Sequence, residues 1–253
     1  LLLWHKLTDD IKIFVQADFA NVGPIDFKCT IKLPNSENTF AFGRYLPKVG
    51  SYMHKNITKL DFIDYPISTY KFGQAQVAPG NPYPSGTALP SFGVNGPGIW
   101  RQDGITFTVG EETKFSLGIY NGSNNGALGA NNGLGQGYFD DDEKAFLLRV
   151  DFKGTEKING ALWYWKDENA LAAPNEYTAL GLNVEYKHEK FASMIEYIKA
   201  DWNPLAGGTN EATDLMVQFI VPMTEKKTDF MLRYEKHDHD NGGVSPADDA
   251  GDH

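Results

Sequence analysis

The chain has 253 residues, 41% of them hydrophobic, and a formal net charge of −10. This acidic balance argues against a nucleic-acid partner, and the single cysteine, Cys29, excludes an internal disulfide framework. No apolar run reaches the roughly 18 residues of a transmembrane helix, but a membrane barrel stays possible because its strands show only every second residue to lipid.

The first elements along the chain are segments in which apolar and polar side chains alternate. Residues 11–19 place Ile, Ile, Val, Ala and Phe on one face and Lys, Phe, Gln and Asp on the other. Residues 25–32 repeat the pattern with Ile, Phe, Cys and Ile against Asp, Lys, Thr and Lys. Successive strand side chains point to opposite faces, so the pattern predicts strands with one apolar face. Residues 39–46, bulky on both faces, are a less clear strand.

Residues 47–98 form the longest connection in the chain, and we interpret them as a loop that folds into a barrel and constricts it. A connection of this length without strands is usually functional or disordered. Its basic residues, the predicted pore constriction, are Lys48, His54, Lys55, Lys59 and Lys71. A low-dielectric constriction focuses the field of a few charges, so these residues would favour anions. Alternatively, they are solvated or paired with Asp61 and Asp64.

Alternation continues through the C-terminal half. In residues 146–153, Phe146, Leu148, Val150 and Phe152 share one face, which is predicted to meet lipid. Residues 180–187, 215–221 and 230–235 show the same pattern, whereas residues 158–165 are bulky on both faces. The opposite faces would line a water-filled lumen. The basic residues predicted for this wall are Arg44, Arg149 and Arg233, and the acidic residues that share it are Asp151, Glu185, Glu196 and Glu235.

The connections between about twelve such strands alternate between short and long. The short ones are residues 8–10, 34–37, 110–113, 154–157, 187–190 and 224–227, and those between them are mostly longer and rich in Gly, Asn, Pro and Asp. This alternation is typical of an up-and-down outer-membrane barrel, whereas a soluble sandwich has Greek-key connections. The sequence therefore predicts an all-β, antiparallel transmembrane barrel.

Strand parity predicts that residues 1–253 are a single barrel domain, incomplete at both ends. The first visible strand enters a tight turn, and the last ends in an outer loop, so an even-numbered barrel needs further strands on both sides. About 16 strands would complete it. Aromatic residues toward the long-loop ends of the strands predict an interfacial girdle; these are Trp100, Trp163, Trp165, Tyr177 and Trp202.

Four short motifs between residues 38 and 122 resemble the phosphate-selective porin O/P family of Gram-negative outer-membrane β-barrel porins. They are FGRYLPK at residues 42–48, LDFIDYP at 60–66, RQDGI at 101–105 and GIYNG at 118–122. The resemblance implies a 16-stranded barrel, a homotrimer and passive uptake of anions such as phosphate. The chain lacks the dense ladder of basic lumen residues that the phosphate-selective members carry.

Clusters that suggest other chemistry have plainer interpretations. The acidic run at residues 140–143 lacks the spacing of a Ca²⁺ loop, and we interpret it as a solvated loop or a cation bridge to lipopolysaccharide. His237 and His239 would share a strand face, which permits Zn²⁺, but a polar loop entrance is the preferred interpretation. No catalytic constellation or nucleophile-elbow pattern is visible. We therefore predict no enzyme activity, no metal and no cofactor.

These observations predict an outer-membrane porin for passive diffusion of small polar solutes, chiefly anions such as phosphate. Its expected partners are small ions or solutes, outer-membrane lipid and lipopolysaccharide, and two further copies in a homotrimer. The alternative is a scaffold barrel that encloses a partner protein such as an electron-transfer cytochrome, for which markedly more than 16 strands would be expected.

Overall fold

The computed structural model describes residues 2–18, 23–52, 102–121, 144–168, 176–202, 210–224 and 228–240. These residues form twelve strands and one sheet, in which every strand pairs with its neighbours in the sequence. The strands are β1 (Leu2–Lys6), β2 (Ile11–Asp18), β3 (Gly23–Lys32), β4 (Thr39–Tyr45), β5 (Gln102–Val109), β6 (Lys114–Tyr120), β7 (Ala145–Lys153), β8 (Ile158–Glu168), β9 (Glu176–His188), β10 (Phe191–Trp202), β11 (Asn210–Thr224) and β12 (Thr228–Asp240).

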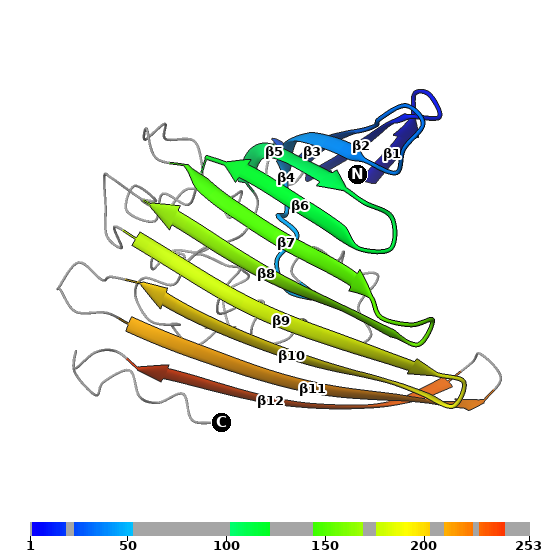
Figure 1. The fold of residues 1–253 in the computed structure, drawn as a ribbon, viewed down its shortest axis with the longest axis vertical. Helices are drawn as coiled ribbons and strands as arrows, with labels where there is room; N and C mark the ends of the chain where they lie inside the picture. The colour runs from blue at the N-terminus through cyan, green and yellow to red at the C-terminus, as the bar shows by residue number, and fades with distance from the viewer. Residues whose placement is uncertain are drawn as a thin grey trace.

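All eleven strand pairs are antiparallel, which confirms the predicted all-β, up-and-down architecture. Figure 1 shows one curved sheet in which the short connections gather at one end of the strands. β4 pairs with β5 across the long connection, with Phe42 opposite Ile105. The predicted alternation of short and long connections therefore places one turn-rich rim opposite the rim from which the long segments leave.

The turn between β5 and β6 shows how the sequence closes a hairpin. Gly110 has a φ of 101°, a left-handed conformation that side chains rarely adopt, and a Cβ there would collide with the Thr113 carbonyl oxygen. The amide of Gly110 also donates to Oδ1 of Asn38, at the neighbouring turn before β4, over 3.0 Å. Glycine is therefore required at this turn for both its backbone and its close neighbour.

The outer face of the sheet is apolar and exposed. It carries the predicted lipid-facing residues Phe146 and Leu148, followed on later strands by Leu182, Phe219 and Leu232. Exposed apolar area this extensive is stable in hydrocarbon and not in water. The outer surface of the sheet is therefore that of a β-barrel wall that faces lipid. In the described ranges, no helix is long and apolar enough to span a membrane.

β1 and β12 are the two edges of the sheet, and among the described strands no pairing joins them. Unpaired backbone groups are costly in hydrocarbon, so each edge needs a partner there. Closure into about 16 strands and the incompleteness of both ends stay predictions. That residues 1–253 form a single domain is likewise a prediction.

The inner face is packed with aromatic side chains, which corrects the predicted girdle. Trp163 and Trp165 of β8 point inward and are fully buried, because Leu162 and Tyr164 take the lipid-facing positions between them. The ring of Trp165 lies 5.4 Å from that of Tyr120 between centroids. The two tryptophans are therefore part of the inner packing; the remaining girdle side chains, Trp100, Tyr177 and Trp202, lie outside those described.

Gly181 makes room for the Trp163 ring, so adding a single methyl group at this position should reduce the stability of the fold. A Cβ at Gly181 would overlap the indole of Trp163 on the neighbouring strand. We expect Gly181→Ala to lower the free energy of unfolding by about 1–3 kcal/mol, since the ring must leave its position. Urea titration of the chain folded in liposomes, followed by tryptophan fluorescence, measures the change.

Gly154→Ala is the matched control, because the nearest atom to its Cβ is Cγ2 of Ile158 at 3.6 Å, an ordinary contact. Equal urea midpoints of unfolding for Gly181→Ala and Gly154→Ala would show that the Trp163 ring adjusts freely.

Candidate functional site

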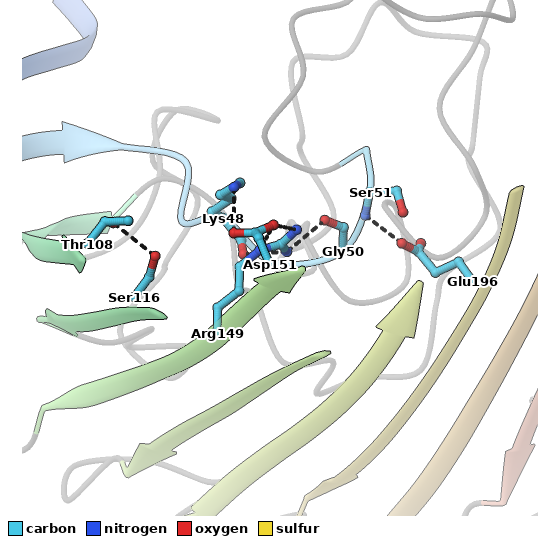
Figure 2. A network of polar contacts seen from close by, with 8 residues as sticks. All are labelled: Lys48, Gly50, Ser51, Thr108, Ser116, Arg149, Asp151 and Glu196. Atoms are coloured by element: carbon cyan, nitrogen blue, oxygen red, sulfur yellow. Dashed lines mark hydrogen bonds and ion pairs between the residues drawn. The ribbon is translucent and has the colours of Figure 1, made fainter. Parts of the chain in front are cut away.

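A polar site occupies the inner face where the chain leaves β4 and crosses the wall. Residues 47–52 run over the inner face of β7 and β10, and six residues make the contacts to these two strands. We call them the anchor site: Lys48, Gly50 and Ser51 of the segment, and Arg149, Asp151 and Glu196 of the wall. Figure 2 shows them converging from the segment and from two strands.

Arg149 is the centre of the anchor site. Its side chain is only 4% exposed. Its Nη1 donates to the carbonyl oxygens of Lys48, at 3.0 Å, and Gly50, at 3.2 Å. Its Nε and Nη2 donate to Oδ1 of Asp151 at 2.9 and 2.8 Å. A guanidinium offers several donors in one plane, so one side chain joins the backbone of a segment about 100 residues earlier to a carboxylate of its own strand.

Asp151 is shared between two cations. Its Oδ2 accepts a 2.7 Å hydrogen bond from Nζ of Lys48, while Oδ1 accepts from Arg149. Partial burial lowers the pKa of the Lys48 ammonium, and its bond to Asp151 acts in the opposite direction. The charges of Lys48 and Arg149 therefore face a carboxylate and do not stand alone on the wall.

Glu196 holds the next residue of the segment. The Ser51 amide donates to Oε2 of Glu196, and both groups are buried. Gly50 lies against the same carboxylate: a Cβ added at Gly50 would sit 3.5 Å from its Oε2. A charge-assisted bond from a buried backbone amide fixes the position of the chain more firmly than a neutral one.

Tyr52 extends the contact to β11 and β12. Its hydroxyl donates to Oε1 of Gln218 over 2.9 Å, and the guanidinium of Arg233 lies 5.6 Å from its ring centroid. Arg233 also donates to Gln218, at 3.3 Å, and to Glu235, at 3.2 Å. Residues 48–52 are thus bonded to β7, β10 and β11 in succession.

Hydroxyl groups form a second polar feature of the inner face, on β4 to β6. Oγ1 of Thr106 lies 2.6 Å from the hydroxyls of both Tyr45 and Tyr120. Thr108 and Ser116 are hydrogen-bonded over 2.9 Å and lie beside the anchor site in Figure 2. These neutral bonds satisfy polar groups within the sheet and add no charge to the site.

A carboxylate and an imidazole meet on the inner face of β11 and β12. Nδ1 of His237 lies 3.3 Å from Oδ2 of Asp214, which is directly opposite it in the strand register. The Asp214 side chain is 1% exposed and that of His237 is 10% exposed. A carboxylate that orients an imidazole is an arrangement capable of acid–base chemistry.

The structure places some predicted site residues together and separates others. Lys48 and Arg149 meet in the anchor site, and Arg233 contacts Tyr52. Arg44 lies elsewhere: its Nη1 is 3.9 Å from Oδ2 of Asp103 on β5. His54, Lys55, Lys59 and Lys71 lie outside the described residues, as does most of 47–98. The inward constriction loop and its lysines therefore stay predictions.

Sequence reasoning missed Ser51, Asp214 and Gln218. Each is a common polar residue without a motif, and each acquires its role from a residue far away in the chain. One signal was available: Asp214 and Gln218 share the inward face of β11 with Met216, so a buried acid and a buried amide were predictable there.

In the described part of the chain, no group of three or more His, Cys, Asp or Glu side chains lies close enough together to hold a metal ion. The acidic run at residues 140–143 and the side chains of His239 and Asp240 are not described. His237, one of the two predicted Zn²⁺ candidates, instead contacts Asp214.

Comparison with known proteins returns structural likeness only. No family model and no curated protein matches the sequence. Among solved structures, the chain resembles OmpTdeltaL8, a loop L8 deletion mutant of the Vibrio cholerae outer membrane protein OmpT, with 10% identity, a TM-score of 0.47 and coverage of 94% of this chain and 83% of that one. It also resembles in-vitro folded OmpT of Vibrio cholerae, with 12% identity, a TM-score of 0.40 and coverage of 93% and 77%.

The predicted passive porin for anions is wrong. The cations predicted to draw anions along the wall are neutralised, because Arg149, Arg233 and Lys48 each face a carboxylate, and the buried acids among the described residues are Asp26, Asp167, Glu196 and Asp214. The alternative, a barrel that encloses a partner protein, stays a prediction.

The prediction that the chain is not an enzyme also needs correction. It rested on the absence of an acid–base arrangement, and the structure pairs Asp214 with His237, 23 residues apart in the sequence. The sequence did not reveal the pair, because it depends on the register between β11 and β12.

Proposed function

We propose that the protein is an occluded outer-membrane barrel, in which the wall holds a segment of its own chain across the interior. Residues 47–52 are the bound segment, and the anchor site holds them. The interior of such a barrel is occupied by polypeptide at this level and is not an open path for diffusing ions. The proposal differs in this way from a passive channel.

The observation that carries the proposal is the position of Arg149. A guanidinium whose side chain is 4% exposed is stable in a membrane protein only if its donors are satisfied. Two of its partners are carbonyl oxygens of the segment, so the segment and the charge stabilise each other. Releasing the segment would leave Arg149 with Asp151 alone and Glu196 without the Ser51 amide.

Cross-linking tests whether the segment lies on the wall in a membrane. Ser51→Cys and Glu196→Cys, in a Cys29→Ser background, place thiols at two positions joined by a hydrogen bond in the native chain. A short bis-methanethiosulfonate reagent should join them rapidly in liposomes, because it replaces the length of the lost glutamate side chain. The linked product is recognised by its altered mobility after denaturation.

The matched control combines Ser51→Cys with Thr108→Cys, on β5 at the far side of the site in Figure 2. It should link much more slowly. Equal rates for the two pairs would mean that residue 51 moves freely inside the barrel, and the occluded state would be ruled out.

The expected partners follow from the outer face. We propose that outer-membrane lipid and lipopolysaccharide cover the exposed apolar residues of β6 to β12, since these alternate with inward side chains along each strand. The homotrimer and membership of the phosphate-selective porin family rest on sequence motifs alone. Sedimentation in detergent would test the trimer.

A further inference from the structure

Oxygen atoms without hydrogen-bond partners gather beside the anchor site. Asp214 has one buried carboxylate oxygen, Oδ1, without a hydrogen-bond partner, and Oδ1 of Asn183 is in the same state, while the buried hydroxyl of Ser51 lies against the Glu196 carboxylate. Buried polar atoms are almost always paired in folded proteins, so the unpaired oxygens of Asp214 and Asn183 point to a missing partner.

Strand register brings these oxygens around Glu196. Asn183 on β9 is directly opposite Glu196 on β10, and Asp214 on β11 is opposite Ile198, two residues further along the same face. Neighbours of this kind have Cβ atoms about 5–8 Å apart, within reach of carboxylate and amide side chains. Figure 2 shows the Ser51 hydroxyl on the side of the segment that faces the Glu196 carboxylate.

The local charge is negative. Asp151 faces both Arg149 and Lys48, and Glu235 faces Arg233. Glu196 and Asp214 are 2% and 1% exposed and lie close enough to interact electrostatically. The neighbouring His237 balances one carboxylate only when it is protonated. Two neighbouring buried carboxylates, one of which has an unpaired oxygen, are costly unless a cation joins them.

We propose that Glu196, Asp214, Asn183 and the Ser51 hydroxyl form a binding site for a divalent cation of the calcium type. Hard cations take carboxylate, amide and hydroxyl oxygens, which are the groups that converge here. Because Ser51 belongs to the segment and the other three to the wall, a bound ion would also fasten residues 47–52 to β9, β10 and β11. The site does not depend on whether the interior is occluded to solutes.

Terbium luminescence tests the proposal directly. Tb³⁺ takes the ligands of Ca²⁺, and the indole of Trp163, which lies against Gly181 two residues from Asn183, can sensitise it. The detergent-folded chain should show terbium emission on tryptophan excitation, and added Ca²⁺ should displace it. Asp214→Asn and Glu196→Gln should each weaken binding at least tenfold.

Asp201→Asn is the control, since Asp201 lies on the same strand as Glu196 but is partly exposed and pairs with Lys199. It should bind like the unaltered chain. Should Asp214→Asn or Glu196→Gln fail to fold, Ser51→Ala removes a single ligand from the segment and should weaken binding as well. Unchanged affinity in the folded variants, or equal loss in Asp201→Asn, would overturn the site.

Discussion

Replacing Arg149 by methionine is expected to release residues 47–52 from the wall. The substitution removes four hydrogen bonds, two to the segment and two to Asp151, and leaves Asp151 with Lys48 alone. Removing one partner of a buried ion pair costs about 3–5 kcal/mol. If about 3 kcal/mol of this is the free energy that holds the segment on the wall, the fraction of molecules with a released segment rises roughly 100-fold.

Maleimide labelling of Ser51→Cys, in a Cys29→Ser background, measures this release. Ser51 is buried, so the thiol should react slowly in the parent and about 100-fold faster when Arg149→Met is added, by the same free energy. Ionic current through planar bilayers should rise in parallel, because the freed segment no longer occupies the interior.

Two variants separate the role of Arg149 from general damage to β7. Lys153→Met removes an exposed cation at the end of the same strand and should leave labelling unchanged. Arg149→Lys keeps the charge but lacks the planar fork that reaches both carbonyl oxygens, so it should give an intermediate rate. A parent chain that labels as fast as Arg149→Met would show that the segment is not held.

Replacing Leu182 by lysine is expected to cost about 2–4 kcal/mol of folding free energy, the value for a cation at the middle of the bilayer on a barrel's outer face. Leu182 lies near the middle of β9, opposite Leu162 of β8 and Tyr197 of β10, and is 44% exposed on the outer face. Reversible folding into liposomes across a urea series gives the free energy.

Met223→Lys provides the comparison that isolates the membrane. Met223 is more exposed, at 64%, but lies at the turn end of β11, where a cation reaches the interface and costs about 0–1 kcal/mol. If the outer face lay in water, both substitutions would change the folding free energy only slightly. Equal small effects for Leu182→Lys and Met223→Lys in liposomes would therefore place the outer face outside lipid.

The architecture was predictable from the sequence because it depends on local rules. Two-residue periodicity assigned Phe146 and Leu148 to the outer face, and the alternation of connection lengths predicted antiparallel neighbours and a turn-rich rim. Both signals extend over a few residues and need no distant partner. They were weaker for β8, where bulky residues occupy both faces, and there Trp163 and Trp165 were assigned to the wrong environment.

The site was decided by tertiary structure. Nothing near Arg149 in the sequence indicates that it binds the carbonyl oxygens of Lys48 and Gly50, or that Asp214 meets His237 across a strand pair. A charge acts through its nearest neighbours, and in a sheet these are set by register and by segments that return from far along the chain. Local alternation therefore predicts which side chains meet lipid, whereas strand register and the returning segment set which inward charges are paired and which buried oxygens lack a partner.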